Sequence, residues 1–226
     1  MSMTDSIGDH TELMDSVYRR QRYIYDFTRK YYLLGRDRLI RELDLAPGAK
    51  VVEIGCGTGR NLVKLAQRYP GVSFYGLDAS REMLKSAERA VAQSGLSERI
   101  GLAHGLAEDL SSAMFGLEEP FTDAIFSYSL SMIPDWKQAL MKASAAVGTG
   151  RVHIVDFGDL EGLGAPVAAL LRAWLRLFHV TPRKEILQRI ESQSGFMEQT
   201  ESLRILPAHY AFIWQGSGKA VQSLAL

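Results

Sequence analysis

The segment from Val51 to Asn61 limits the possible folds more than any other part of this chain. It reads Val-Val-Glu-Ile-Gly-Cys-Gly-Thr-Gly-Arg-Asn, so a short apolar run with one acid leads into three alternating glycines and then a helical pattern. This order predicts a buried parallel strand that turns sharply into a helix. Gly55, Gly57 and Gly59 have no Cβ and can let the backbone approach a ligand closely, beside the unpaired N–H groups of the helix N-terminus. The segment therefore predicts a nucleotide-type cradle.

Two alternatives to this interpretation are disfavoured by the same residues. The dinucleotide fingerprint G-x-G-x-x-G needs its third glycine at position 60, where the chain has Arg60. A tight turn without any ligand rarely needs three alternate glycines. A ligand other than a nicotinamide dinucleotide is expected.

The composition limits the protein class but not the substrate. The 226 residues suit one large domain, or one domain with an appendage, and a hydrophobic content of 46% supports a full core. The 26 basic and 26 acidic residues cancel, so nucleic-acid binding is not predicted. The single cysteine cannot form an internal disulfide, and the five histidines show no metal-ligand spacing, so no metal is expected. Without a signal peptide or a long apolar run, we expect a cytoplasmic protein that can still attach to a membrane.

The chain alternates strand and helix patterns over most of its length. Strands are expected near 51–54, 72–78, 99–104, 121–128 and 151–155, with helices between them, and a closing hairpin at 198–206 and 210–215. Residues 216–226 look like a loose tail. This alternation predicts an α/β fold, a three-layer Rossmann-like sandwich with a mostly parallel sheet and a C-terminal β-hairpin. The domain itself is expected at 48–226, preceded by a helical cap at 1–47.

Polar residues follow the predicted fourth and fifth strands. Ser127, Tyr128 and Ser129 leave the fourth strand, and Asp156 and Asp159 follow the fifth. Catalytic groups in open α/β sheets lie outside the carboxyl ends of the strands, so these residues are candidates for the reaction centre. A lone tyrosine at this place is as often part of the core, and either acid can instead cap the segment that follows.

The first 47 residues combine basic and aromatic side chains. Within 16–41 there are eight bases against two acids, interleaved with tyrosines. Such rings have an apolar body and a polar tip, which suits a bilayer interface or a lid over a site. The alternative is a pair of capping helices with solvated charges.

A second unusual segment covers residues 164–184. One broad face is apolar, and Arg172, Arg176, Arg183 and Lys184 supply bases on or after the other side. A basic amphipathic helix with aromatic residues on its apolar face is typical of an interfacial membrane anchor. Packing against the sheet is the alternative, but two separate basic amphipathic segments favour a peripheral protein on the inner face of the cell membrane.

The glycine segment, with Glu53 two residues before Gly55, resembles motif I of the class I S-adenosylmethionine-dependent methyltransferases, and this resemblance covers about residues 48–215. Asp78, nineteen residues after Gly59, is placed to accept hydrogen bonds from both ribose hydroxyls. Leu106 stands where many such enzymes have an acid for the adenine amine. Met83 suits either the adenine face or the core. The cofactor contacts that the resemblance implies are Glu53, Gly55, Cys56, Gly57, Gly59, Asn61, Asp78, Ala79, Ser80, Met83, Leu106, Ala107, Glu108 and Ser127.

A narrower resemblance extends over the whole chain. The runs at 25–40, 127–136, 153–159 and 178–183 are similar to those of bacterial diacylglyceryl-homoserine N-methyltransferases, which make a trimethylated betaine lipid. This resemblance implies repeated transfer of the sulfonium methyl of S-adenosylmethionine to a lipid amine, with S-adenosylhomocysteine as the product. Positioning contributes most of the acceleration in such a transfer.

The same resemblance implies roles for residues outside the cofactor cradle. Aromatic rings attract methylated cations, and water or a tyrosine or aspartate relay can remove amine protons; the catalytic candidates are Tyr25, Tyr32, Tyr128 and Asp156. An arginine suits the homoserine carboxylate. The substrate-binding candidates are Arg29, Arg36, Ser129, His153 and His179. The alternatives left open are a phosphatidylethanolamine N-methyltransferase, a soluble small-molecule methyltransferase and a non-catalytic S-adenosylmethionine-binding membrane module.

Overall fold

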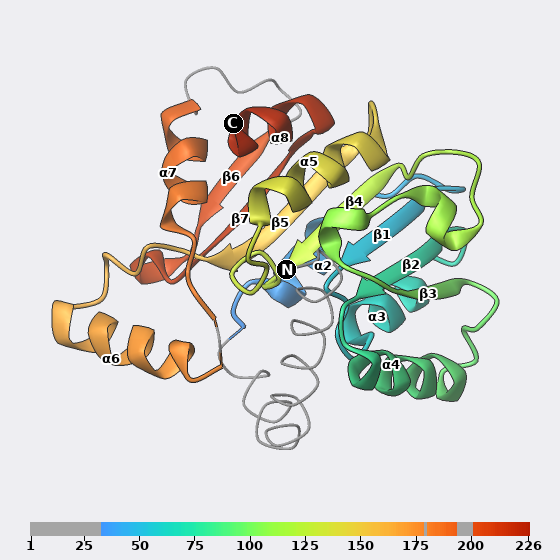
Figure 1. Cartoon of the computed structure of the whole chain (residues 1–226), viewed down its shortest axis with the longest axis horizontal. Coiled ribbons are helices and arrows are strands. Elements are labelled where there is room, and N and C mark those ends of the chain that lie inside the picture. Colours follow the sequence, from blue (N-terminus) through green and yellow to red (C-terminus); the bar gives the residue numbers. More distant parts are fainter. Residues whose placement is uncertain (1–32, 179, 194–200) are drawn as a thin grey trace, which may run out of the picture.

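A computed structural model of the chain describes residues 33–178, 180–193 and 201–226. One seven-stranded sheet runs through it in the order β3-β2-β1-β4-β5-β7-β6 (Figure 1). The strands are β1 Lys50–Ile54, β2 Ser73–Asp78, β3 Ile100–His104, β4 Asp123–Ser127, β5 Arg151–Phe157, β6 Ser202–Ile205 and β7 Ala211–Ser217. The first five pair in parallel, whereas β7 is antiparallel to both β5 and β6.

Helices cover both faces of this sheet. They are α2 Arg36–Glu42, α3 Arg60–Arg68, α4 Arg81–Gln93, α5 Trp136–Val147, α6 Ala165–Arg176, α7 Lys184–Gln193 and α8 Gly218–Ala225. One hydrophobic core joins the sheet to α2, α3 and α4, and a second joins it to α5, α7 and α8. All five residues of β4 are buried, as expected for a central parallel strand covered on both faces. The predicted three-layer α/β fold with a terminal hairpin is confirmed.

The C-terminal segment is more ordered than the sequence suggested. The prediction of a loose tail at 216–226 is wrong, because α8 spans most of it. Ser217 caps the helix by accepting a hydrogen bond from the Ala220 amide at 3.2 Å. Val221 and Leu224 are buried at helical spacing, and Ser144 Oγ of α5 donates to the Gly218 carbonyl at 2.7 Å. A serine cap followed by apolar residues three apart is the local signal that indicates this helix.

Helix α6 lies at the periphery of the molecule (Figure 1). It follows β5 and contacts the core through Ala168 and Leu175, which are buried. Three large apolar side chains on the helix or just after it, Val167, Leu170 and Leu177, are exposed. Within the part of the chain that the structure describes, no helix has both the length and the apolar character needed to cross a bilayer.

Candidate functional site

The glycine turn after β1 has the backbone geometry that the sequence predicted. Gly55, Gly57 and Gly59 have φ values of 74°, 56° and 72°, in the left-handed region that glycine adopts without strain. The amides of Gly55 and Cys56 donate to the Leu77 carbonyl at 2.8 and 3.0 Å, which fixes the turn to the end of β2. The turn then opens into α3.

Asp78, the last residue of β2, is held by the backbone on both sides. The Gly57 amide donates to Oδ2 at 2.7 Å, and the Ser80 amide donates to Oδ1 at 2.9 Å. A carboxylate offers about four acceptor positions, and ribose hydroxyls are donors of the kind that it accepts. The side chain is half-buried beside the glycine turn. This geometry suits the predicted ribose contact.

Three of the predicted cofactor residues form a buried polar network behind the turn. Asn61 Nδ2 donates to Glu53 Oε1 at 2.7 Å and to Ser127 Oγ at 3.2 Å. These side chains come from α3, β1 and β4, so the network ties together the elements that surround the turn. Because buried polar groups need partners, the network also restricts the orientation of each side chain.

Ser129 lies directly against the glycine turn. A Cβ at Gly55 would lie only 2.6 Å from the Ser129 Cβ, so an L-residue with a side chain does not fit at position 55. Ser129 Oγ is buried and makes no hydrogen bond to any residue that the structure describes. A close backbone approach and an unsatisfied hydroxyl at one place both fit a polar ligand such as S-adenosylmethionine.

The predicted adenine-side residues also gather beside Asp78. The Gly105 amide donates to the Asp78 carbonyl at 3.1 Å, which brings the segment from Leu106 to Glu108 next to this strand end. His104 Nε2 lies 3.0 Å from the Ala79 carbonyl oxygen. Ser80 Oγ caps α4 by accepting from the Met83 amide at 3.3 Å.

Met83 and Cys56 both face the protein interior. Met83, in the first turn of α4, is buried in the core, which is the alternative that the sequence left open for it. The Cys56 sulfur lies 2.8 Å from where a Cβ at Gly76 would be. Burial, together with the charges of Asp78 and Glu53, raises the pKa of the Cys56 thiol well above its usual range.

Asp156 lies at the carboxyl end of β5, as predicted, but its oxygens face the backbone. Oδ2 accepts from the Ser131 amide at 3.0 Å and Oδ1 from the Phe157 amide at 2.7 Å. Burial raises the pKa of this carboxyl to about 6, and the amide bonds offset the effect only in part. Asp156 therefore anchors the loop after β4, which contains Ser129.

Tyr128 is also committed to contacts within the protein. Its hydroxyl donates to the Leu34 carbonyl, and its ring meets the Phe157 ring edge-on with centroids 4.7 Å apart. Burial and the nearby Asp156 raise its pKa well above the usual tyrosine range, while the charge of Arg36 acts in the opposite direction. Its φ of 57° is unusual for a residue with a side chain and marks a constrained position at this strand end. Arg36, a predicted substrate contact, is thus brought to the same edge of the sheet.

The remaining candidates are not all brought together. Tyr25, Arg29, Tyr32 and His179 lie outside the described residues, so their predicted roles stay predictions. His153 is fully buried in β5, and its Nε2 lies 2.8 Å from Asp123 Oδ1, at the beginning of β4. The side chain therefore points toward the amino edge of the sheet, away from the carboxyl edge where Asp78 lies.

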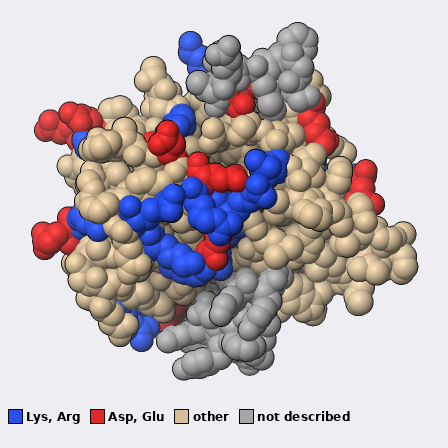
Figure 2. Space-filling model, turned by 180° about the vertical axis from the view of Figure 1, so that it is seen from behind, with Lys and Arg blue, Asp and Glu red and all other residues tan. Residues whose placement is uncertain are grey.

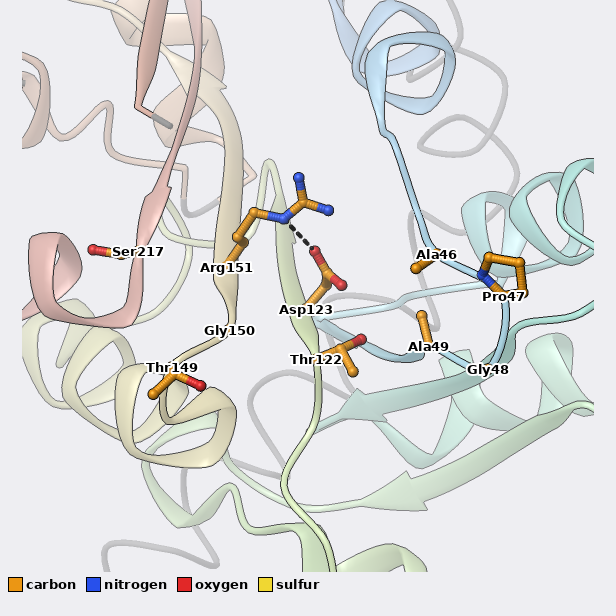
Figure 3. A pocket seen from close by; sticks show the side chains of 10 residues that line it. All are labelled: Ala46, Pro47, Gly48, Ala49, Thr122, Asp123, Thr149, Gly150, Arg151 and Ser217. Atoms are coloured by element: carbon orange, nitrogen blue, oxygen red, sulfur yellow. Dashed lines mark hydrogen bonds and ion pairs between the residues drawn. The ribbon is translucent and has the colours of Figure 1, made fainter. Parts of the chain in front are cut away.

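Asp123 is the centre of an ionic cluster at this amino edge. Arg151 Nε donates a hydrogen bond to its Oδ1 at 3.2 Å. The two side chains line a cavity of about 520 Å³, which lies where β4 and β5 begin and beside the segment that leads into β1 (Figure 3). Burial alone would raise the pKa of Asp123, but the bond to His153 and the charge of Arg151 hold it below its usual value. The cluster joins β4 to β5 and gives His153 Nε2 a partner within the protein, whereas its buried Nδ1 has none among the described residues.

Asp159 and His209 were not singled out together in the sequence, although they lie side by side. His209 Nδ1 is 3.2 Å from Asp159 Oδ1, within ion-pair distance. Fifty positions separate them, so no local motif connects them. Within the described ranges, no three His, Cys, Asp or Glu side chains gather in a way that could hold a metal ion.

Comparison with known proteins agrees with this geometry. Residues 51–150 match the family model of a methyltransferase domain. A ubiquinone/menaquinone biosynthesis C-methyltransferase of Geotalea daltonii is 27% identical over 153 residues, covering 65% of this chain and 62% of the relative. A demethylmenaquinone methyltransferase of Anoxybacillus flavithermus is 30% identical over 142 residues, covering 60% and 52%. The chain thus spans less than two thirds of either relative.

A solved structure shows the same fold. The S-adenosylmethionine-dependent methyltransferase SibL, in its apo form, superposes with a TM-score of 0.64 at 21% identity, covering 87% of this chain and 58% of SibL. Residues 51–150 thus match a methyltransferase domain, and the likeness to SibL shows a shared fold, while the glycine turn and Asp78 have a geometry that fits S-adenosylmethionine.

Proposed function

We propose that the protein transfers methyl groups from S-adenosylmethionine to an amine in the head group of a membrane lipid, with diacylglyceryl-homoserine as the acceptor. The observation that carries this proposal is a row of exposed apolar side chains on α6. Val167, Leu170 and Leu177 are 55%, 72% and 66% exposed. Their spacing places them on one side of the helix, and the half-buried Trp174 lies between them.

This apolar row lies beside the carboxyl edge of the sheet. Helix α6 follows the loop that leaves β5, and Arg172 donates to the Asp159 carbonyl at 2.8 Å. Trp174 packs edge-on against Phe178 with ring centroids 4.9 Å apart, so one side of the row is held rigidly. A lipid-facing helix at the mouth of the site would let a diacyl acceptor present its head group without leaving the bilayer.

The arginines expected to bind anionic lipid have contacts of their own. Arg172 is bonded to Asp159, and Arg183 donates to the Ile133 carbonyl at 3.0 Å. Both therefore tie the α6–α7 segment to the loops at the site. The exposed apolar row, more than these two charges, supports a membrane contact at α6, and thereby a peripheral position on the inner face of the cell membrane.

The chain's own residues supply binding and orientation for the reaction. S-adenosylmethionine brings an electrophilic sulfonium methyl, and the glycine turn with Asp78 would hold its adenosyl part. The half-buried Tyr210 ring, which meets the Phe157 ring with centroids 5.9 Å apart, would attract a methylated ammonium group through cation–π contact. Arg36, near Tyr128, would pair with the homoserine carboxylate.

A second candidate acceptor is the ring carbon of a quinone precursor. One of the two relatives above is named as a ubiquinone/menaquinone biosynthesis C-methyltransferase and the other as a demethylmenaquinone methyltransferase. The exposed apolar row on α6 would bring the protein to the membrane for either acceptor, the lipid amine or the quinone precursor. The two candidates differ in the atom that is methylated.

The deciding experiment follows methyl label from S-adenosylmethionine with purified protein. Separate vesicle preparations contain diacylglyceryl-homoserine, phosphatidylethanolamine or a demethylated quinone, and a further sample contains soluble metabolites. Label in mono-, di- and trimethylated diacylglyceryl-homoserine is expected. Label in another acceptor would replace this proposal with the matching alternative, and S-adenosylmethionine binding without any transfer would favour a non-catalytic module. The Asp78→Ala variant serves as the control for background transfer.

A further inference from the structure

We propose that His209, held by Asp159, accepts the proton that the acceptor amine must lose before each methyl transfer. This inference rests on the proposed function, because it assigns a proton acceptor to the amine reaction. Of the residues predicted for catalysis, Tyr128 and Asp156 are engaged with backbone groups, and Tyr25 and Tyr32 lie outside the described residues. Another group at the carboxyl edge is needed if the protein itself removes the proton.

The two side chains have the arrangement of an oriented imidazole. His209 Nδ1 is buried and lies 3.2 Å from Asp159 Oδ1, within ion-pair distance but without hydrogen-bond geometry, while 41% of the whole side chain is exposed. Since Nδ1 is the covered atom, the exposed part of the ring includes the Nε2 side. Asp159 is only 8% exposed, and its Oδ1 also accepts from the Glu161 amide at 3.0 Å. A buried carboxylate on one ring nitrogen leaves the other nitrogen free to take up a proton.

The backbone around the pair is constrained from both sides. Leu160, Ala208 and His209 have φ values of 64°, 58° and 50°, which residues with side chains rarely adopt. The Leu160 amide donates to the His209 carbonyl at 3.1 Å, and the Gly158 amide donates to the Tyr210 carbonyl at 3.0 Å. Strained backbone of this kind is found at functional sites more often than elsewhere.

Gly158 and Gly162, in the loop after β5, show how closely this loop packs against the turn before β7. A Cβ at Gly158 would lie 2.2 Å from the His209 carbonyl oxygen, and one at Gly162 would lie 2.5 Å from the Ala208 Cα. The loop after β5 and the turn before β7 therefore interlock without room for larger residues. The imidazole is held by a rigid frame, as a proton acceptor requires.

The Asp159–His209 pair also lies at the carboxyl edge of the sheet. Strand β7 begins at Ala211, which pairs with Phe157 at the carboxyl end of β5. The Phe157 ring contacts Tyr128 on one side and Tyr210 on the other, so aromatic rings lead from the end of β4 to the neighbour of His209. Acceptors of α/β enzymes bind outside this edge.

The proton step balances without any further reactant. An N–H bond of the substrate ammonium breaks, its electron pair stays on nitrogen, and the proton goes to His209 Nε2. The nitrogen pair then forms the bond to the methyl carbon, while the pair of the broken C–S bond leaves with sulfur. The imidazolium then returns its proton to water through its exposed side. Each of the three transfers releases one proton.

The test uses the full chain and three single variants. His209→Asn removes the proton acceptor while keeping a residue that tolerates positive φ, and Asp159→Asn removes only the charge. Glu161→Gln, an exposed neighbour, is the matched control. We expect His209→Asn to lower kcat about 100-fold near neutral pH, with unchanged affinity for S-adenosylmethionine by calorimetry. The deficit should shrink as pH rises and the amine loses its proton to water.

Each result bears on the inference separately from the proposed function. If wild type labels no lipid amine, the proposed function fails. If wild type is active and a folded His209→Asn variant keeps a kcat within about threefold of it from about pH 6 to 9, His209 is not the proton acceptor. If His209→Asn does not fold, Asp159→Asn decides, because a partial loss that recovers at high pH supports the pair and a loss that is equal at every pH contradicts it.

Discussion

The backbone amide of Gly57, in the turn after β1, donates a 2.7 Å hydrogen bond to Oδ2 of Asp78 at the end of β2. The Ser80 amide holds the other oxygen at 2.9 Å, so the carboxylate is oriented by the protein itself. Orienting a group before the ligand arrives lowers the cost of binding. The glycine turn and the acid thus form one unit, although twenty residues lie between Gly57 and Asp78 in the chain.

Replacing Asp78 with alanine should weaken S-adenosylmethionine binding by roughly 1.5 to 3 kcal/mol, the usual range for hydrogen bonds to a charged acceptor. The Gly57 and Ser80 amides would lose their partner as well, so a small loss of thermal stability is expected. Isothermal titration calorimetry measures the affinity, and circular dichroism checks the fold. Unchanged affinity in a folded variant would remove Asp78 from the cofactor site.

Gly55→Ala should lower both stability and cofactor affinity, because its Cβ would meet Ser129 at 2.6 Å in addition to the strain of a φ of 74°. Gly95→Ala is a matched control, since Gly95 has a φ of 65° but nothing within 4 Å of the added Cβ. We expect Gly95→Ala to cost about 1 kcal/mol of unfolding free energy and to leave binding intact. Equal losses in both variants would show that the Ser129 contact does not matter.

Asp156 should make stability depend on pH in a defined direction. Its pKa is about 6 in the folded protein against an ordinary value of 3.8, so the folded state binds more protons between these values. The resulting stabilisation is fully present below about pH 4 and is lost as pH rises through about 6. Relative to Asp156→Asn, which has no proton to lose, wild type should lose on the order of 3 kcal/mol of unfolding free energy by pH 7.

Chemical denaturation at a series of pH values measures this difference directly. All other titrating groups are shared by the two proteins, so they cancel in the comparison. The side-chain amide of the Asp156→Asn variant has a single oxygen and can accept only one of the two backbone bonds, which shifts the whole curve of the variant by a constant. Parallel curves for wild type and variant would contradict the raised pKa.

The sequence predicted the sheet well because strand burial and turn residues leave a local signature. The positions of Asp78, Asp156 and Tyr128 at strand ends follow from that signature alone. The direction of a side chain does not, since a single-sequence pattern cannot distinguish His153 bonded to Asp123 from His153 facing a substrate. The Asp159–His209 pair forms only because β7 inserts between β5 and β6, a long-range event without a local signal.

The apolar row on α6 predicts membrane binding that does not depend on lipid charge. Replacing Leu170 and Leu177 with serine removes the two most exposed members, at 72% and 66%. Each fully buried leucine contributes about 1.5 to 3 kcal/mol, so binding to neutral and anionic vesicles should fall together in a sedimentation assay. Because neither side chain supports the core, thermal stability should remain. Unchanged sedimentation would favour a soluble acceptor.

A basic patch on α2, α3 and β6 is expected to attract anionic lipid. It comprises Arg38, Arg41, Arg60, Lys64, Arg68 and Arg204, which are joined through Asp37, Glu42 and the Arg41 carbonyl. Figure 2 shows this group of bases at the centre of the face opposite the one viewed in Figure 1. Six bases around two acids leave an excess positive charge on this face.

Such a patch should attract anionic lipid through charge alone, since each base near the surface contributes about 1 kcal/mol. Replacing Arg41 and Arg68 with glutamine should therefore weaken binding to anionic vesicles by about 2 kcal/mol, roughly 30-fold, and leave binding to neutral vesicles unchanged. Raising the salt concentration should shrink the difference because it screens exposed charges. Lys142 and Lys219 lie on α5 and α8, in the helical layer on the other face of the sheet, and their double glutamine variant is the control. An equal loss in both variants would mean that net charge, and not this patch, governs the attraction.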